Sequence, residues 1–171
     1  MSIAPGPESR KQFGNLIEKY ERGVLHLCCI YLRDMHMAED AVQETFLKAY
    51  KSLSAFRGES SEKTWLYRIA INVCIDMRRS RWYRFIDQRV DMDKLSIPTN
   101  GVSVVSIALM QEILRLPARY REVVFLFYYE DMKLAEIAQL LRISVSTVND
   151  RLRKARELLR KALEGGMADG E

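Results

Sequence analysis

Basic, amide and hydroxyl side chains are concentrated near the C-terminal end of the chain, between residues 144 and 161. Arginine and lysine attract phosphate groups, whereas asparagine, serine and threonine form directional hydrogen bonds with base edges. This combination makes DNA the first binding partner to test. The residues expected to face DNA are Ser144, Ser146, Thr147, Asn149, Asp150, Arg151, Arg153, Lys154 and Arg156.

Two predicted helices position these side chains. Apolar residues at one-turn spacing predict a short helix over residues 134–141 and a long basic helix after Ser144, which is placed to cap it. This order is typical of a helix-turn-helix, whose second helix enters the major groove of DNA. The alternative is a solvated basic helix in an ordinary bundle. The apolar stripe of the long helix consists of Val148, Leu152, Ala155, Leu159 and Ala162.

A second polar surface is expected on a helix near the middle of the sequence. Arg68, Asn72 and Arg79 recur at helical spacing, so that guanidinium groups there can hold phosphates while the amide hydrogen-bonds an exposed base. Arg68 can equally be an ordinary surface charge. The buried face of this helix is expected to contain Trp65, Leu66, Ile69, Ala70, Val73 and Met77.

The loop before this helix has residues suited to enclosing a base. Gly58 lets the backbone come close to a ligand, because glycine lacks a Cβ atom. Phe56 can stack on a base, or it can anchor the loop in the core. The loop residues of this candidate surface are Phe56, Arg57, Gly58, Glu59 and Ser60.

Apolar periodicity divides the chain into two helical parts. Helical patterns cover residues 13–31, 41–53 and 65–77, and they return from residue 107 onward. Between residues 82 and 105 the periodicity is absent and proline, asparagine and glycine accumulate, which is typical of a flexible connection. No strand pattern of useful length occurs. The sequence therefore predicts an all-α fold with two small helical domains joined by a flexible linker.

The composition is that of a folded protein with local basic clusters. Hydrophobic residues make up 48% of the 171 residues, which excludes wholesale disorder. The net charge is only +4, but basic residues gather at 78–84 and 142–161, where a phosphate backbone would meet them. No apolar run approaches the roughly twenty residues of a membrane helix, and the first residues lack a hydrophobic signal core. We expect a cytoplasmic protein without direct membrane insertion.

Cysteine and histidine do not form a metal or redox motif. Cys28, Cys29 and Cys74 have no CxxC spacing, and two of them lie on apolar helix faces, so buried thiols are expected. His26 and His36 are separated by a helical pattern and do not suit a zinc pair. We therefore expect no catalytic residue, no metal and no cofactor.

Three separated motifs resemble those of one bacterial protein family. They are AEDAVQETFLKAY (residues 38–50), FRGESSEKTWLYRIAINVCIDMRR (56–79) and the helix-turn-helix. Their order and approximate spacing resemble those of extracytoplasmic-function (ECF) sigma factors of bacterial RNA polymerase, over nearly the whole chain. The resemblance implies sigma region two at 9–81, a flexible linker at 82–105 and sigma region four at 106–163. The short tail at 164–171 is expected to be frayed, as chain ends commonly are.

The resemblance also implies residue roles in region two. The second helix would dock on the large clamp subunit of the polymerase through Glu39, Asp40, Gln43, Glu44 and Phe46. The alternative is a solvated acidic helix start, which suits the positive end of the helix dipole. The residues around a base flipped from the minus-ten element would be Lys48, Phe56, Arg57, Gly58, Glu59, Ser60, Arg68, Asn72 and Arg79.

Region four would read the minus-thirty-five element as duplex DNA, through the DNA-facing residues of the second helix. Ser146 stands where relatives usually carry glycine, and Asn149 and Asp150 stand where they carry a basic residue and then serine. A carboxylate repels phosphate but accepts a hydrogen bond from the cytosine amino group. Asp150 is therefore expected to shift which bases are preferred.

The implied function is that of a non-enzymatic alternative sigma factor. Its partners would be core RNA polymerase, promoter DNA as duplex and as melted strand, and an anti-sigma factor, which in relatives is often membrane-anchored. Two other classes fit less well. A stand-alone repressor or activator would not explain the motifs of region two. A helical metalloenzyme built on His36, Glu39, Asp40 and Glu44 would need two Glu-x-x-His motifs, which the chain lacks.

Overall fold

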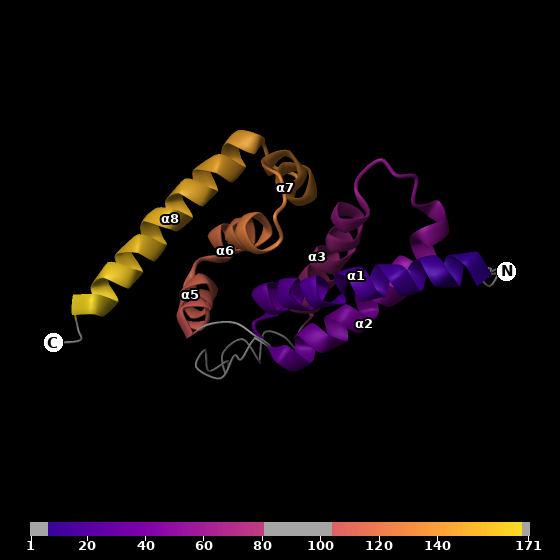
Figure 1. The fold of residues 1–171 in the computed structure, drawn as a ribbon, viewed down its shortest axis with the longest axis horizontal. Coiled ribbons are helices and arrows are strands. Elements are labelled where there is room, and N and C mark those ends of the chain that lie inside the picture. Colours follow the sequence, from indigo (N-terminus) through magenta and orange to yellow (C-terminus); the bar gives the residue numbers. More distant parts are fainter. Residues whose placement is uncertain (1–6, 81–103, 169–171) are drawn as a thin grey trace. The chain divides into compact units, whose positions relative to one another are not determined.

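The computed structural model describes residues 7–80 and 104–168, and within these ranges it contains helices and no strand (Figure 1). The chain forms two compact units, which meet in the sequence at Leu95 and Ser96. The predicted all-α fold with two helical domains is confirmed. The predicted flexible linker falls almost wholly outside the described residues, although Val104 already begins a helix.

The first unit is a three-helix lobe. It consists of α1 (Pro7–Leu32), α2 (Met35–Ser52), the short 3₁₀ turn η1 (Leu53–Ala55) and α3 (Glu62–Arg79). Each of the three α-helices packs on the other two, as Figure 1 shows. The largest fully buried side chains of this core are Val24, Leu27, Ile30, Leu32, Leu66, Tyr67 and Val73.

Side-chain caps fix where α2 and α3 begin. The Asp34 carboxylate accepts a hydrogen bond from the backbone N–H of Met37 at 2.8 Å. The Ser61 hydroxyl likewise accepts from the backbone N–H of Thr64 at 3.1 Å. Each cap satisfies an amide that has no partner within its helix. The loop before α3 therefore has a defined end at Ser61.

The three cysteines lie in the core of this lobe. Cys28, Cys29 and Cys74 are free and buried, which confirms the prediction for the two on apolar faces. Burial raises the pKa of the Cys29 thiol to about 12. A hydrogen bond with the Cys74 thiol, together with burial, raises the pKa of Cys28 well above its ordinary value. Thiols in this state contribute to packing and are poor nucleophiles.

The second unit contains the helix-turn-helix. It consists of α5 (Val104–Arg115), α6 (Ala118–Val124), the π-helical turn η3 (Phe125–Tyr129), α7 (Leu134–Leu141) and α8 (Val145–Ala168). The long helix α8, coloured yellow in Figure 1, packs on α6 and α7 within this unit. The predicted short and long helices are thus both present.

The predicted apolar stripe of α8 is only partly buried. Val148, Leu152 and Ala155 are buried as expected, but Leu159 is half-buried and Ala162 is exposed. The prediction was wrong at Ala162, because the last turns of α8 extend past the packed part of the unit (Figure 1). The tail that we expected to fray from residue 164 is helical as far as Ala168.

Replacing Arg142 with glycine is expected to stabilise the second unit by about 1 kcal/mol. Arg142 ends α7 in the left-handed conformation, with φ 57° and ψ 44°, which is strained for a residue with a Cβ atom. Arg142→Ala keeps the Cβ atom and serves as the matched control. Urea denaturation of the two variants measures the difference, and equal midpoints would contradict a role for this strain.

Candidate nucleic-acid and polymerase interfaces

The start of α8 is shaped by the hydroxyl groups of its first turn. Ser144 accepts a hydrogen bond from the backbone N–H of Thr147 at 3.1 Å, which confirms the predicted cap. The Ser144 hydroxyl also lies 2.9 Å from that of Ser146 and 2.7 Å from that of Thr147. The three hydroxyls therefore form one cluster at the N-terminal end of α8, and this is the end of a recognition helix that enters a DNA groove.

The exposed side of α8 is mainly basic. Arg153 lies between Asp150, at 3.7 Å, and Glu157, at 3.2 Å, and Lys154 also pairs with Glu157, at 3.1 Å. The hydrogen bond from Lys154 is the largest cause of the lowered pKa of Glu157. Exposed pairs of this kind contribute little to stability, so the basic groups can exchange these carboxylates for phosphate. The exposed candidate residues of this side are Ser146, Asn149, Asp150, Arg153, Lys154 and Arg156.

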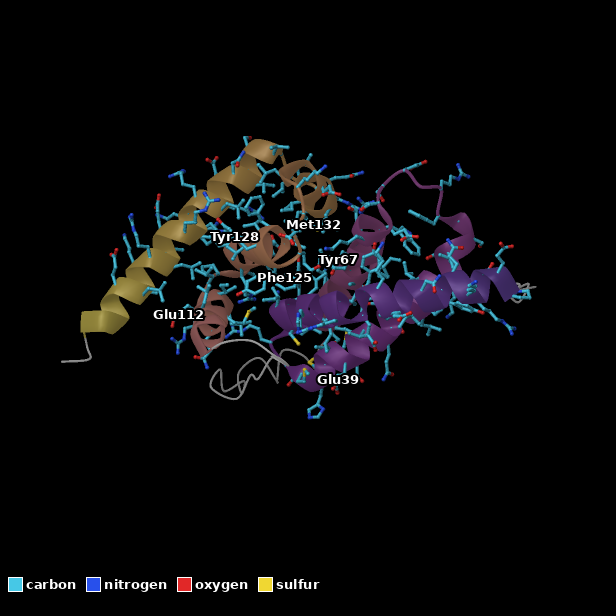
Figure 2. The ribbon with its side chains drawn as sticks, in the orientation of Figure 1. Glu39, Tyr67, Glu112, Phe125, Tyr128 and Met132 are labelled. Atoms are coloured by element: carbon cyan, nitrogen blue, oxygen red, sulfur yellow. The ribbon has the colours of Figure 1, made fainter. Side chains whose placement is uncertain are left out.

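Two arginines of α8 are held by the preceding helical segment. Arg151 donates to the carboxylate of Glu122 in α6 at 2.8 Å, and these side chains are only 23% and 17% exposed. Arg156 donates to the phenol oxygen of Tyr128 in η3 at 2.6 Å. Figure 2 labels Tyr128 and its buried neighbour Phe125 in this turn. Sequence reasoning missed both contacts.

An apolar groove runs beside the second half of α8. Its volume is about 590 Å³. Little in the sequence indicates this groove, because α5, α6, η3 and α8 must all come together to line it. Its apolar lining includes Leu109, Ile113, Val124, Tyr129, Leu159 and Leu163.

The predicted docking residues of α2 separate into an exposed face and one core residue. Phe46 is only 8% exposed and makes an edge contact with Phe13, so its side chain packs mainly in the core, and its role as a polymerase contact stays a prediction. Leu47 is instead 48% exposed, and it follows Gln43 and Glu44 by one helical turn. That spacing was the signal available in the sequence. The exposed face consists of Glu39, which Figure 2 labels, with Asp40, Gln43, Glu44 and Leu47.

The loop before α3 places an aromatic pair on the surface of the first unit. Gly58 has φ +72°, a left-handed conformation that favours glycine. The rings of Phe56 and Trp65 lie 4.9 Å apart at 35°, and both side chains are half-buried. Trp65 was predicted to be a core residue, and this prediction was wrong. Leu66, Ala70 and Val73 are buried as predicted, whereas Ile69 and Met77 are only half-buried. The core face of α3 also contains Thr64, Tyr67, Ile71 and Cys74.

The polar ridge of α3 continues from this aromatic pair. Asn72 and Arg79 are exposed, whereas Arg68 is partly buried. Residues 65, 68 and 72 share one side of a helix, because they are separated by three and four positions. Lys48 is exposed on α2, where it pairs with Glu44 at 3.6 Å. Arg57 and Glu59 are exposed at the tip of the loop, and Ser60 is half-buried.

Within residues 7–80 and 104–168, no three His, Cys, Asp or Glu side chains lie close enough together to hold a metal ion. No helix in the part of the chain that the structure describes has the length and apolar character needed to cross a membrane.

A three-helix unit followed by a helix-turn-helix unit, each with an exposed polar surface, is the organisation that the resemblance to sigma factors implied. The family model for Sigma-70 region 2 matches residues 16–84, and the model for Sigma-70 region 4 matches residues 106–159. The chain is 36% identical to the ECF RNA polymerase sigma factor SigW of Bacillus subtilis, over 88% of each chain. The protein belongs to the ECF family of RNA polymerase sigma factors, as its motifs predicted.

Further relatives agree with this assignment. The RNA polymerase sigma-H factor of Pseudomonas aeruginosa is 31% identical, over 91% of this chain and 88% of the relative. The sigma factor RpoE of Bartonella quintana, solved with the anti-sigma factor NepR, has the same fold, with a TM-score of 0.74, 22% identity and coverage of 90% of this chain and 98% of that one. CnrH, solved with the cytosolic domain of CnrY, has a TM-score of 0.67 and 25% identity, over 91% and 90% of the two chains.

Proposed function

We propose that the exposed face of α2 docks on core RNA polymerase, and that the polymerase then carries α3 and α8 to two promoter elements. The observation that carries this proposal is the pair of separately folded units, each with its own polar recognition surface, in an ECF sigma factor. The corresponding division is region two at 9–81, a linker at 82–105 and region four at 106–163. The chain itself performs no catalysis, since the polymerase adds the nucleotides.

We propose that α3 and its loop hold a base flipped from the melted minus-ten strand. Flipping costs a few kcal/mol of lost stacking, which a shaped pocket must offset. The Phe56–Trp65 pair supplies an aromatic wall, Gly58 shapes the loop, and Asn72 offers hydrogen bonds one step along α3. Arg79, with Arg68 nearer the aromatic pair, is suited to the strand's phosphates. Binding of the flipped base would couple promoter recognition to strand opening.

In α8, replacement of Asp150 with alanine is expected to change which minus-thirty-five bases are preferred. The side chain is exposed on the outer side of the helix, and a carboxylate there favours cytosine through its amino group while it repels phosphate. Alanine should therefore lower the preference for cytosine at one base position by about tenfold and raise the overall affinity for DNA. Transcription from a library of randomised minus-thirty-five elements measures this, and an unchanged preference would refute the role.

We further propose that an anti-sigma protein holds this sigma factor inactive. Two observations support it: the relative CnrH was solved with the cytosolic domain of CnrY, and the groove of about 590 Å³ offers an apolar surface on the second unit. The protein would act in the cytoplasm, where polymerase and chromosome are. A membrane-anchored partner would retain it at the membrane until released.

The test of the proposed function is transcription by purified core polymerase on fragmented genomic DNA, with and without this protein. New start sites that share two spaced upstream elements are expected only when the protein is added. Absence of new starts, combined with binding of duplex DNA by the protein alone, would favour a stand-alone regulator instead. Mapping the starts also yields the promoter elements needed for the experiments below.

A further inference from the structure

Arg151 differs from the other basic residues of α8 in what holds it. Its guanidinium lies 2.8 Å from the Glu122 carboxylate of α6, across 29 positions of sequence, and both side chains are largely buried. Arg153, by contrast, is 67% exposed and pairs only with acids of its own helix. A largely buried pair between two helices is ordered and little screened by salt. Arg151 is therefore already bound to α6 in the absence of DNA.

We propose that Glu122 and Tyr128 are positioning residues, which hold Arg151 and Arg156 and thereby fix the rotation of α8 about its own axis. This inference rests on the proposed reading of the minus-thirty-five element by α8. Arg151 then acts on promoter choice through the orientation of α8, and the base contacts come from exposed residues such as Asn149, Asp150 and Arg153.

The two contacts lie on opposite flanks of the buried stripe. With 3.6 residues per turn, successive residues are about 100° apart, so Arg151 lies roughly 60° to one side of the Val148–Leu152–Ala155 stripe and Arg156 roughly 80° to the other. The Glu122 contact comes from α6 and the Tyr128 contact from η3. Rotation of α8 in either direction would stretch one of the two hydrogen bonds. The pairs thus restrain α8 from both sides, and the Glu122 pair does so more firmly because the Tyr128 hydrogen bond is exposed to solvent.

The buried stripe alone would not fix this rotation well. It consists of valine, leucine and alanine, whose apolar contacts are non-directional. A rotation of about 20° would move side-chain tips on the outer side of the helix by about 2 Å, given a helix radius of 5–6 Å with side chains. Hydrogen bonds to base edges tolerate only a few tenths of an ångström. A directional restraint on α8 is therefore needed for selective reading.

A direct role for Arg151 predicts the opposite result when Glu122 is neutralised. If Arg151 bound phosphate, Glu122→Gln would release it, so binding would tighten and the salt dependence would grow by about one phosphate contact. If Glu122 positions α8, the same change lowers discrimination between promoters without tightening binding. The sign of the effect separates the two.

The experiment uses holoenzyme formed from core polymerase and the full chain, on a mapped promoter with its native or a scrambled minus-thirty-five element. For Glu122→Gln, the ratio of initiation from the two templates is expected to fall about tenfold, with affinity for core polymerase unchanged. Tyr128→Phe, which removes only the phenol oxygen, should lower the ratio by less. The matched control is Glu112→Gln, another partly buried glutamate of the same unit that pairs with an arginine, Arg115, in α5 (Figure 2).

A charge swap completes the test. The double variant Glu122→Arg, Arg151→Glu is expected to recover most of the lost ratio, because the pair is restored in reverse. The inference would be overturned by any of three results. These are an unchanged initiation ratio in Glu122→Gln, tighter DNA binding by that variant, or a charge-swap variant as defective as Glu122→Gln. If the wild-type holoenzyme itself ignores the scrambled element, the proposed function of α8 fails first, and the inference falls with it.

Discussion

The double variant Asp40→Lys, Glu44→Lys is expected to bind core RNA polymerase about a hundredfold more weakly than the wild type. Both carboxylates are exposed on the proposed docking face of α2, one turn apart. If this face meets basic groups on the polymerase, two reversals convert attraction into repulsion across one small area. Binding of labelled protein to purified core polymerase, repeated at two salt concentrations, measures the loss.

The structure offers a matched control for this charge change. Glu18 and Glu21 are exposed on α1 of the same unit, and their double replacement by lysine changes the net charge equally. That variant is expected to retain wild-type affinity, with both variants folded to the same extent by circular dichroism. An equal loss of affinity in the two variants would mean that the polymerase responds to overall charge, and it would rule out the proposal that this face of α2 docks on it.

Leu47 gives this surface an apolar centre that charge alone does not provide. Its side chain is 48% exposed, beside Gln43 and Glu44 on the same face. Protein interfaces commonly combine a few apolar anchors with a polar rim, and the anchors contribute most of the binding energy. The buried Phe46, by comparison, holds α2 against α1 and so keeps this face in place.

The helices themselves were predictable because apolar residues with a period of 3.6 identify the helix and its approximate buried side. This reasoning found the three-helix lobe, the helix-turn-helix and the Ser144 cap. It was only partly right for α3, where apolar residues surround much of the helix: Leu66, Ala70 and Val73 are buried as predicted, but Trp65 is not. Since Trp65 and Tyr67 are both apolar candidates, only the positions of α1 and α2 decide that Tyr67 is buried and Trp65 packs on Phe56.

Contacts between residues far apart in the sequence could not be predicted in the same way. The Glu122–Arg151 pair spans 29 positions, and each residue alone has the pattern of a surface charge. The π-helical turn of η3 lacks a glycine or proline that would indicate an irregular helix. The groove beside α8 depends on α5, α6, η3 and α8 coming together. The sequence therefore predicted which residues of α8 are exposed, but not the contacts with α6 and η3 that hold two of its arginines.

Replacement of Arg121 with methionine is expected to destabilise the second unit by about 3 kcal/mol. The guanidinium is buried, and it donates to the backbone oxygens of Leu114 at 2.9 Å and Leu116 at 3.1 Å. These carbonyls lie at the end of α5, where a helix has no internal donors left for them. Methionine fills much of the same volume but donates no hydrogen bond, so both oxygens would stay buried without this donor.

The two units allow this loss to be assigned to one of them. Neither tryptophan, Trp65 or Trp82, belongs to the second unit, which begins at Ser96, so tryptophan fluorescence does not report directly on that unit during urea denaturation. Circular dichroism follows the helices of both. Arg121→Met should lower the midpoint of one dichroism transition while the fluorescence transition stays in place. The control is Arg119→Met, which replaces an exposed arginine of the same helix and should move neither transition.

A fluorescence midpoint that falls together with the dichroism midpoint would show that the two units unfold as one. An unchanged dichroism transition would instead mean that solvent or another donor satisfies these carbonyls, and that Arg121 does not hold α5 in place beside the groove.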